Sequence, residues 1–155
     1  MKKTKIFVFI FLVAIIACSL LGCVDVNKNG GIEITDLLGR KVVVPEKVER
    51  VVCIGAGALR LYSYVGDLSK LCGVEDVDKD GTGVGKTLSI RPYKMVNGDI
   101  FNSLPSCGTS GPTGSADAEK ILSCRPDVVF SLYTSDVSAM DELQNRTGIP
   151  VVVLS

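Results

Sequence analysis

The stretch DVDKDGTGVGKT, residues 76–87, carries the residue types of two ligand-binding loops. Its first half, three aspartates at alternate positions followed by a glycine, matches a calcium loop, and its end, Gly-Lys-Thr, matches a phosphate-binding loop. A calcium loop needs a bidentate glutamate at its twelfth position, which is Thr87 here. A phosphate loop needs a glycine where Asp80 stands, and that charge repels phosphate. We therefore predict a solvated loop that binds neither ligand tightly.

A second glycine-rich turn follows the apolar run Val51–Ile54. Gly55-Ala56-Gly57 nearly matches a dinucleotide fingerprint, and Glu75 lies 20 residues after Gly55, where a ribose-binding acid would stand. Arg60 replaces the third glycine, and its bulk works against close packing of helix on strand. A glycine turn that opens a helix explains these residues, so dinucleotide binding is not predicted.

The N-terminus carries Lys2, Lys3 and Lys5 ahead of an apolar run that ends in Leu20-Leu21-Gly22-Cys23. This pattern is typical of an export signal, and its end resembles the lipobox of prokaryotic lipoproteins, in which the cysteine is lipidated. The alternative is an uncleaved membrane anchor, since the run is close to the lower length limit for a span. Both place the rest of the chain outside the cytoplasm. We expect a signal peptide at 1–22, a tether at 23–31 and one folded lobe at 32–155.

Composition excludes several classes of function. Removal of residues 1–22 leaves 133 residues, with 14 Lys and Arg against 17 Asp and Glu, a net charge near −3 that offers nothing to nucleic acid. The chain has no histidine, which rules out a histidine base, a histidine metal ligand or a serine–histidine triad within it. No acid–base pairing is visible in the sequence, so we predict no enzyme activity and no cofactor.

Four cysteines remain beyond Cys23, and no two form a CxxC pair, so a zinc knuckle is not predicted. Cys53 and Cys72 sit in apolar runs and are expected to be buried thiols. Cys107 and Cys124 could pair in an oxidising compartment, and the sequence leaves this open.

The hydrophobic pattern predicts a hairpin and then an alternation of strands and helices. The hairpin strands are Ile32–Thr35 and Lys41–Val44, and the later strands are Val51–Ile54, Leu71–Val74, Asp127–Leu132 and Pro150–Leu154. Helices are predicted at Ala58–Val65, at Ala116–Ser123 with Ser115 as its N-cap, and at Asp136–Arg146. This rhythm predicts an α/β fold: a Rossmann-like lobe with a parallel sheet and helices on both faces, preceded by a short β-hairpin.

The order of four segments resembles the solute-binding lipoproteins of ABC importers for iron–siderophore complexes, haem and cobalamin. The segments are TDLLGRKVVVPEKVERVVCIG, ALRLYSYVGDLSKLCGVED, SADAEKILSCRPDVVFS and GIPVVVLS, and the resemblance extends over essentially all of residues 31–155. The resemblance implies one lobe of a two-lobed receptor that holds its ligand between the lobes. The sequence ends at Ser155, where the helix to the second lobe would begin, so we expect the N-terminal lobe only, with weak ligand binding by itself.

The same resemblance implies which residues meet the ligand and the permease. Substrate contacts are expected from loops at the strand ends, at Gly57, Arg91, Tyr93, Thr109, Tyr133 and Thr134. Arg91-Pro92-Tyr93 could equally be a helix start without a ligand role, because proline suits the first helical turn. Glu119 is expected to dock on arginines of the ABC permease, or to be simply an exposed acid in a first helical turn.

The predicted function is therefore the extracytoplasmic substrate-binding component of an ABC importer for an iron chelate, haem or a corrinoid. The protein is expected on the outer side of the cytoplasmic membrane, in the periplasm or at the cell surface. Two alternatives stay open: a calcium-dependent surface or adhesion module built on the aspartates of 76–87, and a fragment without function.

The lipid anchor gives the first test. Cys23→Ser is expected to abolish labelling by a radioactive or clickable fatty acid and to leave the protein released or misprocessed. Cys18→Ser, within the same apolar run, is the matched control and should label normally. Unchanged labelling of the Cys23 variant would remove the lipoprotein assignment.

Overall fold

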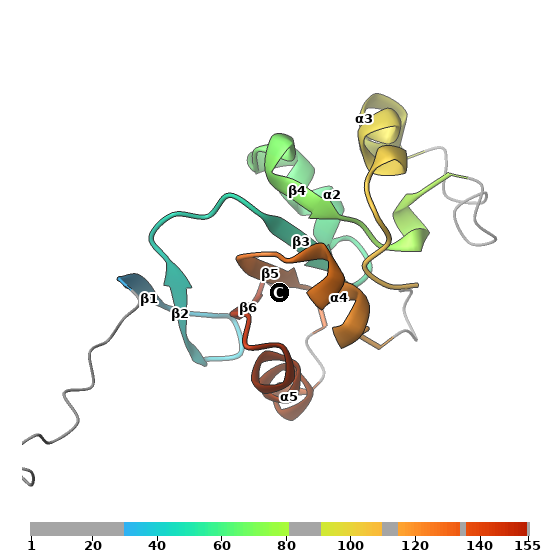
Figure 1. The fold of residues 1–155 in the computed structure, drawn as a ribbon. Helices are drawn as coiled ribbons and strands as arrows, with labels where there is room; N and C mark the ends of the chain where they lie inside the picture. Colours follow the sequence, from blue (N-terminus) through green and yellow to red (C-terminus); the bar gives the residue numbers. More distant parts are fainter. Residues whose placement is uncertain (1–29, 81–90, 110–114, 134–135, 155) are drawn as a thin grey trace, which may run out of the picture. The chain divides into compact units, whose positions relative to one another are not determined.

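A four-stranded parallel sheet forms the centre of the computed structural model, which describes residues 30–80, 91–109, 115–133 and 136–154 (Figure 1). The strands lie in the order β4-β3-β5-β6. Their bounds are β3 Val51–Ile54, β4 Leu71–Gly73, β5 Val128–Ser131 and β6 Val151–Val153. The inner strands are buried along their length because a parallel sheet is covered on both faces, which accounts for their continuous valine-rich sequences.

Alternate residues of each strand enter two separate cores. Val52, Ile54 and Val129 pack with helices α4 (Ala118–Cys124) and α5 (Val137–Thr147). Val51, Cys53 and Val128 pack on the other face with helices α2 (Ala58–Val65) and α3 (Pro92–Ser103). The predicted fold class, a parallel sheet with helices on both faces after a hairpin, is confirmed.

The helix boundaries follow local capping chemistry. Asp136, predicted as the first residue of this helix, is instead its N-cap and accepts hydrogen bonds from the N–H groups of Ser138 and Ala139. The prediction of Ser115 as the cap of α4 is wrong: Asp117 accepts from the Lys120 N–H at 3.1 Å, and the helix begins two residues later than expected. Asp117 is an equally good cap residue, and it stands closer to the apolar stripe that the helix buries.

Helix α3 is an element that the hydrophobic pattern of the sequence did not predict. It begins at Pro92, whose fixed φ and missing N–H suit the first position of a helix. Tyr93 and Phe101 turn into the core, while Met95 and Val96 are exposed, so the sequence lacks a clean apolar stripe. Two short 3-10 turns, Leu68–Lys70 and Asp76–Asp78, flank β4.

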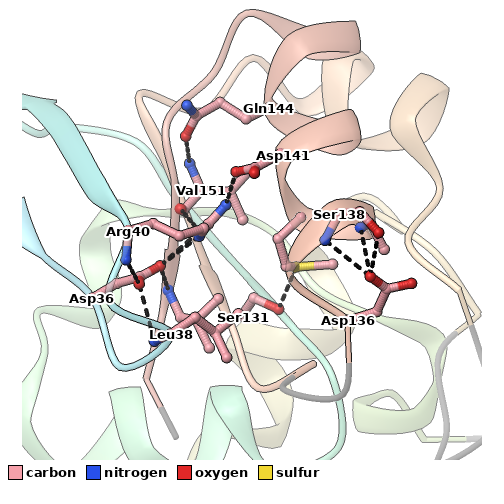
Figure 2. A network of polar contacts seen from close by, with 12 residues as sticks. Asp36, Leu38, Arg40, Ser131, Asp136, Ser138, Asp141, Gln144 and Val151 are labelled. Carbon is pink, nitrogen blue, oxygen red and sulfur yellow. Dashed lines mark hydrogen bonds and ion pairs between the residues drawn. The ribbon is translucent and has the colours of Figure 1, made fainter.

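The hairpin of β1 (Gly31–Thr35) and β2 (Lys41–Pro45) is tied to the sheet by one buried ion pair. Asp36 is fully buried and accepts from Nε and Nη2 of Arg40 at 2.9 and 2.7 Å (Figure 2). The Arg40 guanidinium also donates to the Val151 carbonyl of β6 at 2.6 Å and to Asp141 of α5 at 2.9 Å. The turn thus joins the hairpin, β6 and α5, which explains the Asp-Leu-Leu-Gly-Arg segment.

The Arg-Pro-Asp segment after α4 forms a second junction, at the amino ends of the strands. The Asp127 carboxylate accepts from the N–H groups of Glu49 and Arg50 at 2.8 and 2.9 Å. The Arg50 guanidinium donates to the last carbonyls of α4, at Cys124 and Arg125. Arg125 has a left-handed φ of 51°, which ends the helix ahead of the proline. These contacts hold β3 and β5 in register.

The predicted signal peptide, 1–22, and most of the predicted tether, 23–31, lie outside the described residues. Within the part of the chain that the structure describes, no helix is long and apolar enough to cross a membrane.

The buried ion pair predicts a strong effect of one substitution. Asp36→Asn should lower the free energy of unfolding by roughly 3–5 kcal/mol, because it removes the buried carboxylate that pairs with Arg40 and leaves only the exposed Asp141 as an ion-pair partner. Burial opposes the ionised form of Asp36, but the hydrogen bonds from Arg40 and Val153 outweigh it and lower the pKa of the carboxyl. Its contribution to stability is therefore present above the ordinary aspartate pKa of about 4 and is lost as the pH falls further.

Urea midpoints measured from pH 2 to pH 7 test both statements. The variant should lose less stability on acidification than the wild type does. Glu33→Gln, which breaks the exposed pair with Lys41, is the control and should change little. Equal midpoints for Asp36→Asn and the wild type at pH 7 would show that the junction does not hold the hairpin.

Candidate ligand-binding edge

The order of the strands marks one place on the sheet as a binding site. The chain runs from β3 to one neighbour, β4, and then crosses to the other side of β3 to form β5. The loops after β3 and β5 therefore leave the sheet in opposite directions, and ligands of open α/β sheets bind in the crevice outside the carboxyl ends of such strands. We call this region, formed by Gly55–Gly57, Glu75–Asp76, Cys107–Thr109 and Leu132–Tyr133, the carboxyl edge.

The loops that follow β3 and β5 touch each other at Gly55. Gly55 has a φ of 89°, and a Cβ placed on it would lie 3.2 Å from backbone atoms of Leu132 and Tyr133. The Leu132 N–H donates to the Ile54 carbonyl at 3.0 Å, so the contact is part of the extended sheet ladder. Only glycine satisfies both the left-handed φ and this approach.

A buried carboxylate holds the same loop from the other side. Glu75, which is 2% exposed, accepts from the Gly55 N–H at 3.0 Å. Its position 20 residues after Gly55 resembled that of a ribose-binding acid. The structure gives it a different role, because the carboxylate is turned inward and joins the end of β4 to the turn after β3.

The third part of the carboxyl edge is added by backbone pairing. Val74 pairs in parallel with the segment around Ser106: its N–H donates to the Pro105 carbonyl, and its carbonyl accepts from the Cys107 N–H, both at 3.0 Å. The Asp76 N–H continues this ladder by donating to the Gly108 carbonyl at 2.8 Å. Thr109, a predicted substrate contact, follows at once and is exposed.

Tyr133 lies where β5 ends, as predicted, and lines a pocket of about 330 Å³. Its N–H donates to Ser131 Oγ at 3.0 Å, which holds the backbone at the end of the strand. The pocket lies between the segment leading into α4 and one side of α5. It is lined by Ser115, Ala116, Tyr133, Asp136, Ala139, Met140, Glu142, Leu143 and Arg146. Apolar walls with charged groups among them are typical of small-ligand sites.

Gly57 and Arg60 complete the surface beside Tyr133. Gly57, with a φ of 99°, is the N-cap of α2, and a Cβ on it would lie 3.5 Å from the Leu132 side chain and 3.6 Å from Arg60 Nη2. Arg60 is exposed, and within the described residues it forms no ion pair. From the sequence, Arg60 was expected only to obstruct the binding of a dinucleotide. Its spacing of one helical turn from Gly57 was the signal that could have identified it.

The structure places Tyr93 inside the lobe, although it was predicted as a substrate contact. Its side chain is 3% exposed, and its hydroxyl donates to the buried Asp78 carboxylate at 2.5 Å. Burial raises the pKa of Asp78, and the hydrogen bond from Tyr93 offsets part of this effect. Arg91 is half-buried beside the pair, at the N-cap of α3. Arg91-Pro92-Tyr93 was expected to be either a ligand contact or the start of a helix. For Pro92 and Tyr93 the structure shows the start of a helix.

The aspartates of residues 76–87 do not converge. Asp78 is bound to Tyr93, while Asp80 pairs with Lys94 at 3.5 Å and accepts from Asn102 at 3.1 Å. Among the described residues, no cluster of three acidic or cysteine side chains could hold a metal ion. Residues 81–90, which carry the rest of that loop, and Thr134, a predicted substrate contact, lie outside the described residues.

Glu119 is placed as the docking prediction requires. It is exposed in the first turn of α4, and no ion pair involves it within the described ranges. The positive end of the helix dipole favours an acid there without a partner, so both interpretations of Glu119 are compatible with its position.

The known proteins that this chain resembles are solute-binding proteins. No protein-family model matches the chain. A curated relative, YhfQ of Bacillus subtilis (strain 168), is named provisionally as an ABC transporter substrate-binding lipoprotein. The two are 26% identical over 146 residues, which is 93% of this chain and 41% of the relative.

Solved structures share the fold. The molybdate periplasmic binding protein MolA of Haemophilus influenzae matches with a TM-score of 0.60 and 26% identity, over 80% of this chain and 34% of its own. A periplasmic solute-binding protein of Veillonella parvula DSM 2008 matches with a TM-score of 0.58 and 19% identity, over 79% and 34%. The haem-binding protein HmuT matches with a TM-score of 0.53 and 19% identity, over 81% and 34%. The chain thus spans less than half the length of the proteins it resembles, and its described residues share the fold of solute-binding proteins.

The close approach at Gly55 gives a test of how the carboxyl edge is built. Gly55→Ala should cost roughly 1–3 kcal/mol from its left-handed φ alone, and more because the new methyl group meets backbone atoms of Leu132 and Tyr133. Gly39→Ala is the matched control, since Gly39 has a φ of 76° with nothing within 4 Å of its added Cβ. Urea unfolding should show the larger loss for Gly55→Ala. Equal losses would mean that the two loops are not in contact.

Proposed function

We propose that the protein is the substrate-binding component of an ABC importer and that the carboxyl edge is one wall of its ligand cleft. The single observation that carries this is the 26% identity with a substrate-binding lipoprotein across 93% of the chain. The fold similarity to MolA supports it, because the match extends over 80% of this chain. Two kinds of comparison thus point to the same class of protein, which is not a class of enzymes.

The proposed contact surface is smaller than the predicted one. Gly57, Thr109 and Tyr133 belong to it, and Arg60 is added because its guanidinium is exposed beside Tyr133's loop. Arg91 stays in the proposal as a half-buried cation at the margin, whereas Tyr93 supports the surface from inside. Thr134 stays a prediction.

The chemistry of this surface favours an anionic ligand with an apolar body. Arginine binds carboxylates, catecholates and oxyanions through its fixed fork of donors, and tyrosine adds an apolar face with a polar tip. An iron–siderophore complex, haem or cobalamin remains the proposed ligand class. MolA was solved with molybdate, so a bare oxyanion belongs in any screen. No cofactor is proposed.

The remaining parts of the proposal concern assembly. Lipid on Cys23 would hold the lobe at the outer surface of the cytoplasmic membrane, and Glu119 would meet an arginine of the permease. A ligand enclosed between two lobes is buried on two sides, so the lobe formed by residues 31–155 supplies only part of the contact surface. We therefore expect this lobe alone to bind weakly.

The contribution of Tyr133 tests the proposal. Tyrosine fluorescence is titrated with haemin, a ferric tris-catecholate, cobalamin and molybdate, and the best binder is taken forward. Tyr133→Ala should weaken binding of that probe at least tenfold, which corresponds to about 1.4 kcal/mol, through loss of its aromatic contact. Calorimetry on the same protein gives the dissociation constants independently of fluorescence.

Tyr64→Ala is the matched control, because Tyr64 is 62% exposed on α2 and lies outside the proposed surface. It should bind as the wild type does. Equal weakening by both substitutions, or none by Tyr133→Ala, would place the ligand elsewhere. Submicromolar binding by residues 31–155 would contradict the view that this lobe is only one wall.

A further inference from the structure

Two buried thiols from different elements meet beneath the carboxyl edge. Cys107 belongs to the segment paired with Val74, and Cys124 is the last residue of α4. Both are reduced in the structure and 2% exposed or less. From this geometry we propose that Cys107 and Cys124 form a disulfide when the chain folds in an oxidising compartment, and that this bond fastens the carboxyl edge to α4.

Gly73 brings the two side chains together. A Cβ placed on Gly73 would lie 3.2 Å from the Cβ of Cys124 and 3.3 Å from the Cβ of Cys107, so both Cβ atoms lie close to the same position above Gly73. A disulfide requires Cβ atoms about 3.8 Å apart, which such an arrangement allows. The Cys124 thiol already points to this segment, since its sulfur lies 3.9 Å from the carbonyl oxygen of Ser106, the residue before Cys107.

The other two thiols are less well placed as partners. Cys72 shares a core with Cys124, but its thiol donates to the Val51 carbonyl at 3.4 Å and is directed along the sheet toward β3. Cys53 belongs to the core on the opposite face. The pairing of Cys107 with Cys124 is therefore favoured over any pairing with Cys72 or Cys53.

The chemistry balances with an external disulfide as oxidant. A thiolate of the pair attacks the donor disulfide and forms a mixed disulfide, and the second thiolate then displaces the donor sulfur. The two cysteines lose two protons and two electrons, and the donor is reduced to two thiols. The supply of such a donor rests on the proposed extracytoplasmic location, because disulfides form and persist there.

The folded environment sets the time at which the bond forms. Burial raises the pKa of both thiols, so the native reduced protein holds little of the thiolate that exchange requires. Oxidation should therefore be fast during folding and slow once the lobe is closed. The bond would then fix Cys107–Thr109 against α4, the helix that carries Glu119.

Peptide mapping tests the proposal directly. The full chain is unfolded in reductant, refolded in detergent with oxidised glutathione, blocked with N-ethylmaleimide and digested with trypsin without reduction. Cleavage after lysine and arginine, except before Pro126, places each cysteine of the lobe on its own peptide. These peptides are 51–60, 71–79, 95–120 and 121–146.

The expected result is a linked pair of 95–120 with 121–146, with the other two peptides carrying the blocking group. The linked wild type should have a folded-to-unfolded ratio about 100-fold above that of the same protein in dithiothreitol, as expected for closing a loop of this length. Cys53→Ser/Cys72→Ser should keep the link. Cys107→Ser should lose both the link and the effect of dithiothreitol.

Blocked thiols on both 95–120 and 121–146 after oxidative refolding would overturn the proposal. A link from 121–146 to 71–79 would overturn it equally, by assigning Cys124 to Cys72. The comparison of oxidised with reduced wild type needs no variant, so it decides even if Cys107→Ser does not fold. Missing linkage in a protein whose ligand binding is weakened by Tyr133→Ala refutes the disulfide alone, whereas linkage in a protein whose ligand binding Tyr133→Ala leaves unchanged refutes the proposed site alone.

Discussion

The contact between the turn after β3 and the turn after β5 is the constraint on which the candidate site depends. At Gly55 the two backbones approach so closely that an added Cβ would lie 3.2 Å from Leu132 and Tyr133, and the Glu75 carboxylate holds the Gly55 N–H from the other side. Burial of a carboxylate destabilises the fold unless its oxygens accept hydrogen bonds. The hydrogen bond from Gly55 to Glu75 therefore favours the conformation of the turn in which the Gly55 N–H points at the carboxylate. The positions of Gly57, Arg60 and Tyr133 relative to one another follow from it.

Two arginine junctions hold other parts of the fold together. Arg40 joins the hairpin to β6 and α5, and Arg50, the residue before β3, joins the start of that strand to the end of α4. Across the described residues, no buried side-chain nitrogen or oxygen lacks a hydrogen-bond partner. Polar residues inside the lobe therefore fix the register and docking of its layers, and they leave the carboxyl edge as the region where exposed polar and aromatic groups are available to a ligand.

The sequence predicted the layers of the fold better than the site. Continuous valine runs and the spacing of turns identified β3, β5 and β6, because burial on both faces leaves a direct trace in composition. Helix α3 was left undecided, since its buried Tyr93 and Phe101 are mixed with exposed Met95 and Val96. The N-cap of α4 was misplaced because Ser115 and Asp117 are both good caps, and only packing distinguishes them. A short-range pattern cannot make that choice.

Side-chain direction limited the prediction of the site. Tyr133 was placed correctly at the end of β5, as the topology alone requires. Whether Tyr93 and Arg60 are buried or exposed depends on which face of its helix each residue occupies. Neither the residue type nor the spacing predicts that face. The resemblance to receptor lipoproteins supplied the expected loops, but the inward turn of Tyr93 toward Asp78 became visible only in the packed lobe.

The most direct measurement of the central claim is a map of backbone amide shifts on ligand addition. A ¹⁵N-labelled protein is titrated with haemin and, separately, with molybdate, and the perturbed amides are assigned. The largest shifts are expected on Gly55–Gly57, Thr109 and Leu132–Tyr133, with Glu49 and Asp127 at the other end of the sheet unchanged. Shifts centred on the Arg50–Asp127 junction, or spread evenly over the exposed faces of α2 and α3, would contradict the assignment of the carboxyl edge as the ligand wall.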